Sequence, residues 1–226
     1  DDVPYGEDEA ANVVLRQEGR RRTYPFTPSP HWELAERLGL VDMERGAKLS
    51  GSRFYVLKGK GARLQRALIS WMLDLHPGEH GYEEVYVPNL VTRESAIASS
   101  QLPKFADTMY HDDEDDLWMI PTAEVPITGL HAGEILTPGE LPFRYVAHTP
   151  CFRREKAAAG KDTRGIKRVH QFEKVEMFKF VEAGNSKDEL ETMVADAEDV
   201  CARLGLAYQV SLLCTGDLGV ASTRTY

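Results

Sequence analysis

Apolar residues recur at the spacing of an α-helix in two long stretches of the chain. From Gly61 onward they follow the intervals of one helix face: Leu64, Ala67, Leu68, Trp71, Met72 and Leu75. Pro77-Gly78 is expected to end this helix, because both residues disfavour its continuation. A second stripe, at residues 190–204, follows Ser186-Lys187-Asp188-Glu189, which is typical of a capping box. The second helix is expected to bury that stripe and to end at Gly205.

Shorter apolar runs bounded by turn residues predict strands and one short helix. The strands are expected at residues 53–57, 84–87, 117–120, 143–149 and 208–213. Ser29 and Pro30 are placed to cap and begin a short helix that Gly39 ends. Pro88 belongs at a strand end or edge, because proline donates no hydrogen bond to a β-ladder. These elements predict an α+β fold, with an antiparallel β-sheet flanked by helices.

The most informative segment is residues 150–181, which are expected to form two strands joined by a basic loop. On the first strand Cys151, Arg153 and Glu155 alternate and are predicted to share one side. On the second strand the even positions share a face: His170, Phe172, Lys174, Glu176, Phe178 and Phe180. An aromatic ring and a carboxylate would lie about 13 Å apart on this face. Such a wall suits a ligand with a flat end, an anionic middle and a cationic end, the shape of an aminoacyl-adenylate.

Each of these residues also has an ordinary interpretation. An arginine or glutamate on an edge strand is often only a solvated surface group. Phe172 could be a core residue, and His170 a hydrogen-bonded structural histidine. The loop at residues 156–165 has nothing large and apolar to bury, which is typical both of solvated loops and of loops that move over a ligand. Whether these residues bind a ligand or have ordinary structural roles therefore depends on whether other segments of the chain indicate the same function as this hairpin.

Composition and charge narrow the class of protein. The 226 residues suffice for one domain, expected at residues 29–226, whereas the polar residues 1–28 are expected to form a linker or an extended arm. A net charge of −9 argues against non-specific nucleic-acid binding but permits a local basic patch that contacts a nucleic acid. The three cysteines form no C-x-x-C pair, which favours a reducing compartment without a cysteine-based zinc site. No apolar run approaches the length of a membrane span, so we expect a cytoplasmic protein without a membrane partner.

The common nucleotide-binding motifs are absent, and one acidic run is a candidate metal site. The chain has no G-x-x-x-x-G-K-[ST] motif, and Gly59-Lys60-Gly61 lacks the spacing of G-x-G-x-x-G. Any ATP must therefore be held in another way. The acidic run at residues 112–116 is expected to be a solvated loop, because five adjacent acids repel one another and seldom converge on one metal ion. A metal site there is the alternative interpretation.

A family resemblance runs from about Gly6 to the last residue. It rests on four segments in order: GARLQRALISWMLDLH with GYEEVYVPNLV, IPTAEVPIT, the hairpin at residues 150–181, and LCTGDLG. They resemble motif 1, the serine-binding segment, motif 2 and a signature upstream of motif 3 of class II aminoacyl-tRNA synthetases. In detail the chain is similar to the seryl-tRNA synthetases of the bacterial type, with the class II fold expected.

The resemblance implies an ATP-dependent ligase that activates L-serine and transfers it to tRNA(Ser), with tRNA(Sec) as a further expected partner. Arg153 and Glu155 are the implied catalytic residues, with Arg153 bridging the serine carboxylate and the α-phosphate. The implied serine ligands are Thr122, Ala123, Glu124 and Glu176. The implied ATP contacts are Arg153, Arg154, Glu155, Val169 and Phe172. The implied contacts to the tRNA acceptor end are Lys161, Asp162, Thr163 and Arg164. Mg²⁺ is expected only together with ATP, because it neutralises the triphosphate.

The resemblance also implies a homodimer through the motif 1 unit, with Trp71, Met72 and Pro88 at the interface. An ordinary core helix and strand explain the same apolar pattern. The chain is further expected to lack two parts of the family's enzymes. These are the N-terminal helical arm that grips tRNA and the C-terminal motif 3 segment with its second phosphate-binding arginine. By itself the chain is therefore expected to be weakly active or inactive.

Two other functions stay open. The chain could be a non-catalytic synthetase-like module that binds RNA or a protein partner. It could also be an amino acid:carrier protein ligase, which would be expected to hold zinc through cysteine and histidine. The cysteine spacing offers no obvious zinc set, and a binding module has no need of a complete adenylate site. The retained Arg153, Glu155, Phe172 and Glu176 therefore favour the ligase.

Overall fold

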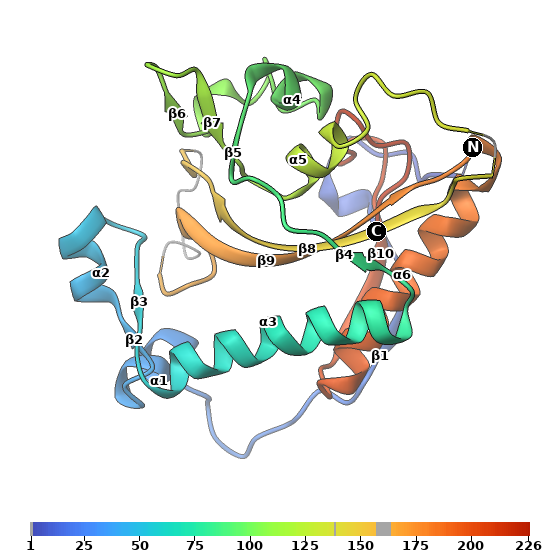
Figure 1. Ribbon diagram of the computed structural model, residues 1–226. Coiled ribbons are helices and arrows are strands. Elements are labelled where there is room, and N and C mark those ends of the chain that lie inside the picture. The colour runs from blue at the N-terminus through green and yellow to red at the C-terminus, as the bar shows by residue number, and fades with distance from the viewer. Residues whose placement is uncertain (1, 138, 157–163) are drawn as a thin grey trace. The chain divides into compact units, whose positions relative to one another are not determined.

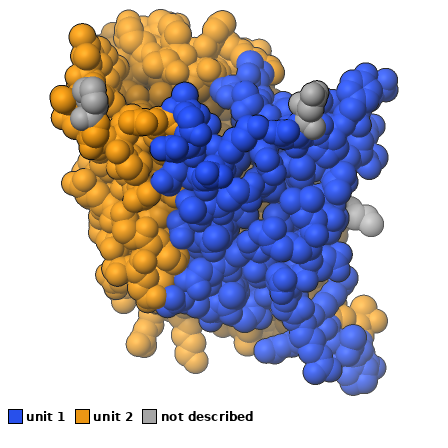
Figure 2. Space-filling model, turned by 90° about the vertical axis from the view of Figure 1, so that its right-hand side faces the viewer, with its two compact units in different colours: residues 1–26, 183–226 blue, residues 27–182 orange. Residues whose placement is uncertain are grey.

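The structure divides into two compact units. It is a computed structural model that describes residues 2–137, 139–156 and 164–226. The terminal unit combines Asp1–Phe26 with Ala183–Tyr226, and the central unit is Thr27–Glu182 (Figure 2). These units do not coincide with the division at residues 28 and 29 expected from the sequence. The hairpin with the candidate chemistry belongs to the central unit.

A long antiparallel hairpin forms the middle of the central unit. Its strands β8 (Phe143–Phe152) and β9 (Gln171–Phe180) pair along their whole length, with Cys151 opposite Phe172. On the other side of β8, the short strand β4 (Glu83–Glu84) pairs in parallel. The expected antiparallel hairpin is thus confirmed, and one short parallel strand is added at its edge.

Helices cover both faces of this hairpin. The long helix α3 (Lys60–Glu79) runs along one face, and α5 (Glu124–Gly129) and α4 (Arg93–Ala98) lie on the other (Figure 1). A small antiparallel sheet has the order β5 (Leu90–Val91), β7 (Leu117–Met119) and β6 (His111–Asp112), and the 3₁₀ helix η2 (Ala106–Thr108) precedes β6. The central unit therefore has the layered α+β architecture that the sequence predicts.

Two buried apolar clusters hold these layers together. One joins the hairpin to the α5 segment and contains Val87, Ala123, Ile127, Tyr145 and Ala147. The other joins α4, α5 and the small sheet and contains Val91, Ala96, Leu102, Met109, Trp118, Ile120 and Val125. Residues of the α5 segment belong to both clusters. Close packing on two sides therefore fixes residues 121–124 next to β9.

The remaining elements of the central unit lie at its N-terminal end. They are α1 (His31–Arg37), β2 (Val41–Asp42), α2 (Met43–Ser50) and β3 (Val56–Leu57), and β2 pairs with β3. Pro30, rather than the expected Ser29, occupies the N-cap of α1, and no side chain caps this helix. Gly39 follows α1 with a φ of 66°, a conformation that glycine adopts without strain, so its expected role at the helix end is confirmed.

The terminal unit is built from the two ends of the chain. It contains η1 (Glu9–Ala11), β1 (Val13–Glu18), η4 (Ala183–Asn185), α6 (Ser186–Arg203) and β10 (Tyr208–Leu212). The expectation of a linker or extended arm is wrong for β1, which pairs antiparallel with β10. Local composition could not reveal this strand, because its partner comes from the opposite end of the chain. The apolar stripe of α6 is only half-buried or exposed, not buried as expected.

Two helix ends differ from their sequence signatures. The N-cap of α6 is Asn185, and the Ser186 hydroxyl donates to the carbonyl oxygen of Ala183 over 3.0 Å, so the predicted capping box is wrong. Pro77 lies inside α3 instead of ending it. A proline in the last turn removes a single intrahelical hydrogen bond, which the helix tolerates for two more residues. No helix in the described part of the chain is long and apolar enough to cross a membrane.

Candidate active site

A polar cluster links the segment before α5 to β9. The Thr122 hydroxyl donates to Glu176 Oε2 over 2.6 Å, and Lys174 Nζ donates to Thr122 Oγ1 over 2.7 Å. Lys174 also forms an ion pair with Glu176. Thr122 is buried, whereas the lysine and glutamate side chains keep 29% and 21% of their surface exposed. The strand period places these two charged residues on the same face of β9, and the packed α5 segment brings the threonine to them.

Glu124 lies beside this cluster in the first turn of α5. Its backbone N–H donates to Thr122 Oγ1 over 3.3 Å. Burial, and then repulsion from Glu176, raise the pKa of the Glu124 carboxyl, while Lys174 acts in the opposite direction. Ala123 is fully buried in the core below them. The carboxylates of Glu124 and Glu176 therefore make this cluster electronegative, and a neighbouring cation stabilises it.

Arg153 follows β8 and shares a cavity with the cluster. Its Nε donates to the carbonyl oxygen of Pro121 over 3.2 Å, and its Cζ lies 5.0 Å from the centre of the Phe172 ring. The cavity measures about 460 Å³, and its lining includes Thr122, Glu124, Lys174, Arg153, Glu155 and Arg168. A guanidinium thus stands between the carboxylates and the aromatic ring.

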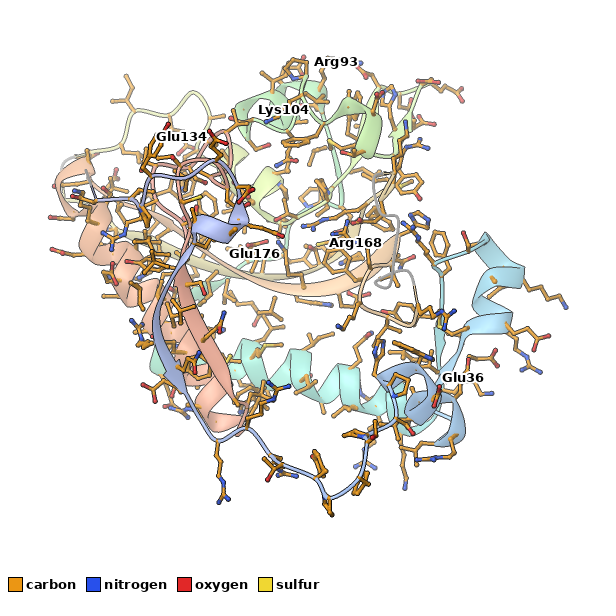
Figure 3. The ribbon with its side chains drawn as sticks, turned by 180° about the vertical axis from the view of Figure 1, so that it is seen from behind. Glu36, Arg93, Lys104, Glu134, Arg168 and Glu176 are labelled. Carbon is orange, nitrogen blue, oxygen red and sulfur yellow. The ribbon has the colours of Figure 1, made fainter. Side chains whose placement is uncertain are left out.

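A second cavity, of about 290 Å³, continues from Arg153 toward the loop end of the hairpin. It is lined by Arg153, Glu155, Ile166, Arg168, Val169 and Phe172, among others. Three of these residues also line the first cavity, so the two cavities adjoin. Arg168 Nη1 donates to Glu155 Oε2 over 2.8 Å. Figure 3 labels Glu176 and Arg168 along this hairpin.

The arrangement can hold one extended ligand by three kinds of contact. Carboxylates and a hydroxyl at the Glu176 end are acceptors for an ammonium group. The Arg153 guanidinium suits a carboxylate or a phosphate, because its planar fork matches both. The Phe172 ring offers a flat face for a planar heterocycle. This order of groups is the one that the sequence predicted for the hairpin.

The structure corrects how two of these residues reach the site. We expected Cys151, Arg153 and Glu155 to alternate along one strand, but β8 ends at Phe152. Glu155 has a φ of 46°, outside the extended region, so strand alternation does not apply to it. Cys151 is fully buried, whereas Arg153 and Glu155 line the same two cavities. A turn after the strand, not its period, brings the arginine and the glutamate together.

Not every expected contact residue lies at these cavities. Arg154 Nε donates to the carbonyl oxygen of Met109 over 2.7 Å, and its Cζ lies 4.6 Å from the centre of the Tyr110 ring. The Arg154 side chain lines neither cavity, so the structure places it outside the site that Arg153 lines. Arg164 is exposed. The other expected loop contacts, Lys161, Asp162 and Thr163, lie outside the described residues.

The expected interface residues lie away from both cavities. Trp71 and Met72 are half-buried on α3, and Pro88 is exposed after β4. On the same helix Leu64 keeps 57% of its surface exposed. The apolar stripe of α3 is therefore only partly covered within the described chain.

Several residues of the site carried no role in the sequence analysis. Lys174 was placed on the correct face of β9, and the strand period alone could have identified it as a neighbour of Glu176. Arg168 precedes β9 in an irregular segment, where no periodic signal exists. Gln101 and Phe105 also line the first cavity from a non-repetitive segment, and only tertiary packing brings them there.

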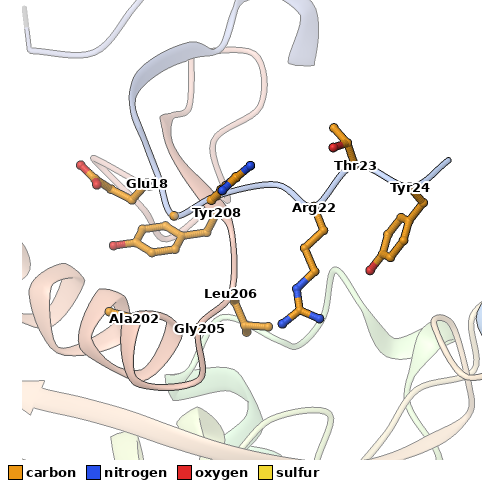
Figure 4. Close-up of a pocket in the computed structure, with 10 residues that line it drawn as sticks. Glu18, Arg22, Thr23, Tyr24, Ala202, Gly205, Leu206 and Tyr208 are labelled. Atoms are coloured by element: carbon orange, nitrogen blue, oxygen red, sulfur yellow. The ribbon is translucent and has the colours of Figure 1, made fainter.

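A larger cavity, of about 640 Å³, belongs to the terminal unit (Figure 4). Its lining includes Arg20, Arg22, Tyr24, Leu206 and Tyr208. It contains none of the residues that the hairpin brings together. Size alone therefore does not make it the candidate site.

The described residues contain no group of three or more His, Cys, Asp or Glu side chains placed to hold a metal ion. In the acidic run, Asp116 is instead tied to its neighbours. Arg93 Nη2 donates to Asp116 Oδ1 over 2.7 Å, and His111 Nε2 lies 2.7 Å from the same oxygen. Asp113 Oδ1 lies 2.9 Å from His111 Nδ1, but the Asp113 side chain is almost fully exposed. The run is thus part solvated loop and part hydrogen-bonded turn.

Known proteins are similar to this chain along nearly its whole length. The family model described as "tRNA synthetase class II core domain (G, H, P, S and T)" matches residues 105–225. The serine–tRNA ligase of Roseiflexus sp. (strain RS-1) is 63% identical over 224 residues, which make up 99% of this chain and 53% of that protein. The chain therefore spans about half the length of the curated relatives it matches.

Solved structures agree with the sequence comparison. Seryl-tRNA synthetase from Pyrococcus horikoshii complexed with ATP has a TM-score of 0.95 at 39% identity, covering 99% of this chain and 54% of that one. The cytoplasmic serine–tRNA ligase from Naegleria fowleri in complex with AMP has a TM-score of 0.93 at 31% identity, with the same two coverages. Since the family model covers more than half of its residues, the chain belongs to the class II tRNA synthetases, and its resemblance to the bacterial-type seryl-tRNA synthetases is confirmed.

Proposed function

We propose that this chain carries the amino-acid activation site of a serine–tRNA ligase. The observation that supports this best is the position of Arg153 between the Thr122–Glu176 cluster and the Phe172 ring. That order matches the order of ammonium, phosphate and base in seryl-adenylate. Two similar structures, described as complexed with ATP and with AMP, support a nucleotide at this site.

The proposed first step joins L-serine to AMP. A serine carboxylate oxygen attacks the α-phosphorus of ATP, a new P–O bond forms, and the bond to the β-phosphate oxygen breaks. Pyrophosphate leaves with that electron pair. The Arg153 fork holds the attacking carboxylate and an α-phosphate oxygen, which aligns the two reactants and offsets the charge that develops on phosphorus. No general base is needed, because the carboxylate is already ionised.

The serine end of the site is assigned to Thr122, Glu124 and Glu176, with the buried Ala123 holding their turn in place. Two carboxylates attract the α-ammonium, and the threonine hydroxyl supplies a hydrogen-bond partner for serine. A polar pocket of this kind discriminates through hydrogen bonds, because an analogue that lacks a partner group leaves a pocket group unpaired.

The adenine end is assigned to Phe172, Glu155 and Val169. The Phe172 ring stacks on the base, and the backbone of the buried Val169 lines its edge. Glu155 accepts from Arg168, so its second carboxylate oxygen is available to an amino group of the base. The Arg154 side chain lies at Met109 and Tyr110 and not at the adenine end. We assign its contribution to ATP binding to its own backbone and to the ordering of residues 108–110.

Mg²⁺ is proposed to arrive with the triphosphate and to neutralise it when bound. The described residues offer no group of three metal ligands. At nucleotide sites Mg²⁺ is usually held by substrate phosphates, water and one or two carboxylates.

Several partners complete the proposal. The activated serine is transferred to tRNA(Ser), with residues 161–164 contacting the acceptor end. Binding of tRNA(Sec) stays a prediction. We propose a homodimer through α3 and the residues after β4, supported by the partly uncovered stripe with Trp71 and Met72. We also propose a cytoplasmic location, because the similar enzyme from Naegleria fowleri is described as cytoplasmic.

The proposal is tested by the variant Arg153→Ala in the intact protein. Serine-dependent ATP–pyrophosphate exchange should fall by about two to four powers of ten, the scale expected when a positioned charge donor is lost. Arg153→Lys should also be poor, because a point charge does not replace a fork. Arg154→Ala is the matched comparison, and it should keep at least about ten times more exchange activity, because its guanidinium points away from the cavity. Exchange by Arg153→Ala within a few-fold of the unmodified protein would contradict the assignment.

A further inference from the structure

Lys174 occupies the same position that the proposed function reserves for the substrate ammonium. Its Nζ donates to Thr122 Oγ1 over 2.7 Å and forms an ion pair with Glu176. Glu124, the other carboxylate of the cluster, interacts with the same lysine charge. An ammonium group of the protein is thus bonded to the groups assigned to the ammonium of serine.

The hydrogen-bonding capacity of Thr122 is already used. A hydroxyl donates one hydrogen bond and accepts two. The Thr122 hydroxyl donates to Glu176 Oε2 and accepts from Lys174 Nζ and from the backbone N–H of Glu124. A further ammonium cannot donate to this oxygen unless one of the two donors leaves. The backbone donor is fixed in α5, so the lysine is the group that can move.

We propose that Lys174 is an internal competitor for the ammonium subsite, and that a bound amino acid displaces its Nζ from Thr122 and Glu176. This inference rests on the proposed function, since it assigns the cluster to the substrate ammonium. Ligands with an ammonium group restore the contacts that Lys174 gives up. Ligands without one leave Lys174 in place, and the pocket stays closed to them.

Charge and mobility are consistent with this exchange. Each displacement replaces one positive charge by another, so the two carboxylates of Glu124 and Glu176 are never left without a neighbouring cation. Lys174 lines the cavity of about 460 Å³ and keeps 29% of its side-chain surface exposed. Its long aliphatic stem can stay on β9 while the ammonium moves into this solvent-accessible space.

The experiment measures ligand affinity with and without the lysine. The variants are Lys174→Met and Lys174→Gln, and Lys179→Met is the matched control. Lys179 is on the same strand, but its Nζ lies 5.5 Å from the ring centre of Tyr82 and outside the cluster. The probes are serine, ethanolamine (ammonium and hydroxyl only) and glycerate (carboxylate and hydroxyl only). Dissociation constants are measured by NMR titration of the intact protein.

Removing the competitor should tighten binding of serine and ethanolamine about threefold to tenfold, the scale of one hydrogen bond between partly exposed groups. Glycerate should gain nothing, and Lys179→Met should behave like the unmodified protein. In the unmodified protein, serine should shift the ¹³Cε signal of Lys174 and leave that of Lys179 unchanged. This last measurement needs no variant that might be unstable.

The outcomes separate this inference from the proposed function. If both Lys174 variants bind serine more weakly and the Lys174 signal does not respond to serine, the lysine only orients Thr122 and Glu176, and the inference is overturned. The proposed function then still stands. If the variants bind ethanolamine more tightly but no protein prefers serine to glycerate, the competition is supported and the assignment of a serine site is wrong.

Discussion

Replacing Glu176 by glutamine tests whether this carboxylate recognises serine and not ATP. The substitution keeps the shape and one acceptor oxygen, so the hydrogen bond from Thr122 can persist. It removes the negative charge that faces Lys174 and, in the proposed complex, the ammonium of serine. Because Phe172 lies four residues away along β9, the nucleotide end of the site should be unaffected.

The size of the effect follows from the exposure of the pair. A hydrogen bond to a charged group contributes about 1.5–3 kcal/mol, and one between neutral groups about 0.5–1.5 kcal/mol. The Glu176 side chain is 21% exposed, so most of that difference is retained. A loss of about 1–2 kcal/mol corresponds to an increase of roughly 5- to 30-fold in the KM for serine. The KM for ATP should stay within about threefold.

The assay is ATP–pyrophosphate exchange in the intact protein, titrated separately with serine and with ATP. Glu173→Gln is the matched control. Glu173 is on the same strand and has a similar exposure. Its Oε2 lies 2.7 Å from His148 Nε2, so its carboxylate faces away from the cluster. Equal losses of affinity for serine and ATP in Glu176→Gln, or an equal serine effect in Glu173→Gln, would refute the assignment.

The other predictions concern assembly and acid stability. Sedimentation equilibrium of the intact protein at about micromolar concentration should show a dimer, because the α3 stripe with Trp71 and Met72 needs an apolar partner; a monomer counts against this interface. Hydrogen bonds from Arg93, and then from His111, lower the pKa of Asp116 to about 2. The ionised carboxylate therefore stabilises the fold above its ordinary pKa of 3.8, and this contribution is lost as the pH falls from about 4 to about 2. Asp116→Asn should flatten the pH dependence of urea stability in that window, and an unchanged slope would contradict the linkage.

Local periodicity predicted which residues share a face, wherever a regular element formed. The period of β9 placed Phe172, Lys174 and Glu176 on one side, and the ion pair between the lysine and the glutamate confirms this. The α3 stripe and the pairing of the hairpin strands were likewise readable, because each depends on neighbours a few residues away. The roles proposed for these residues are a separate matter and remain to be measured.

Chain ends and turns were predicted less well. The expected capping box at Ser186 is wrong. The 3₁₀ helix η4 lies directly upstream, and the Ser186 hydroxyl donates to the carbonyl oxygen of Ala183 in that helix instead of accepting from a backbone N–H of α6. Glu155 leaves the strand in a left-handed turn that no alternation predicts. In both cases a competing local hydrogen bond or turn outweighed the sequence signature.

The sequence by itself determined the periods of the helices and strands and the chemical character of the hairpin wall. Only the tertiary structure decided that Thr122 meets Lys174 and Glu176, that Arg153 donates to Pro121, and that β1 pairs with β10. The physical reason is the range of the interactions. A period is set by neighbouring residues, whereas a contact between residues about thirty or more positions apart forms only when apolar burial on both sides of a segment, such as α5, holds it against its partner.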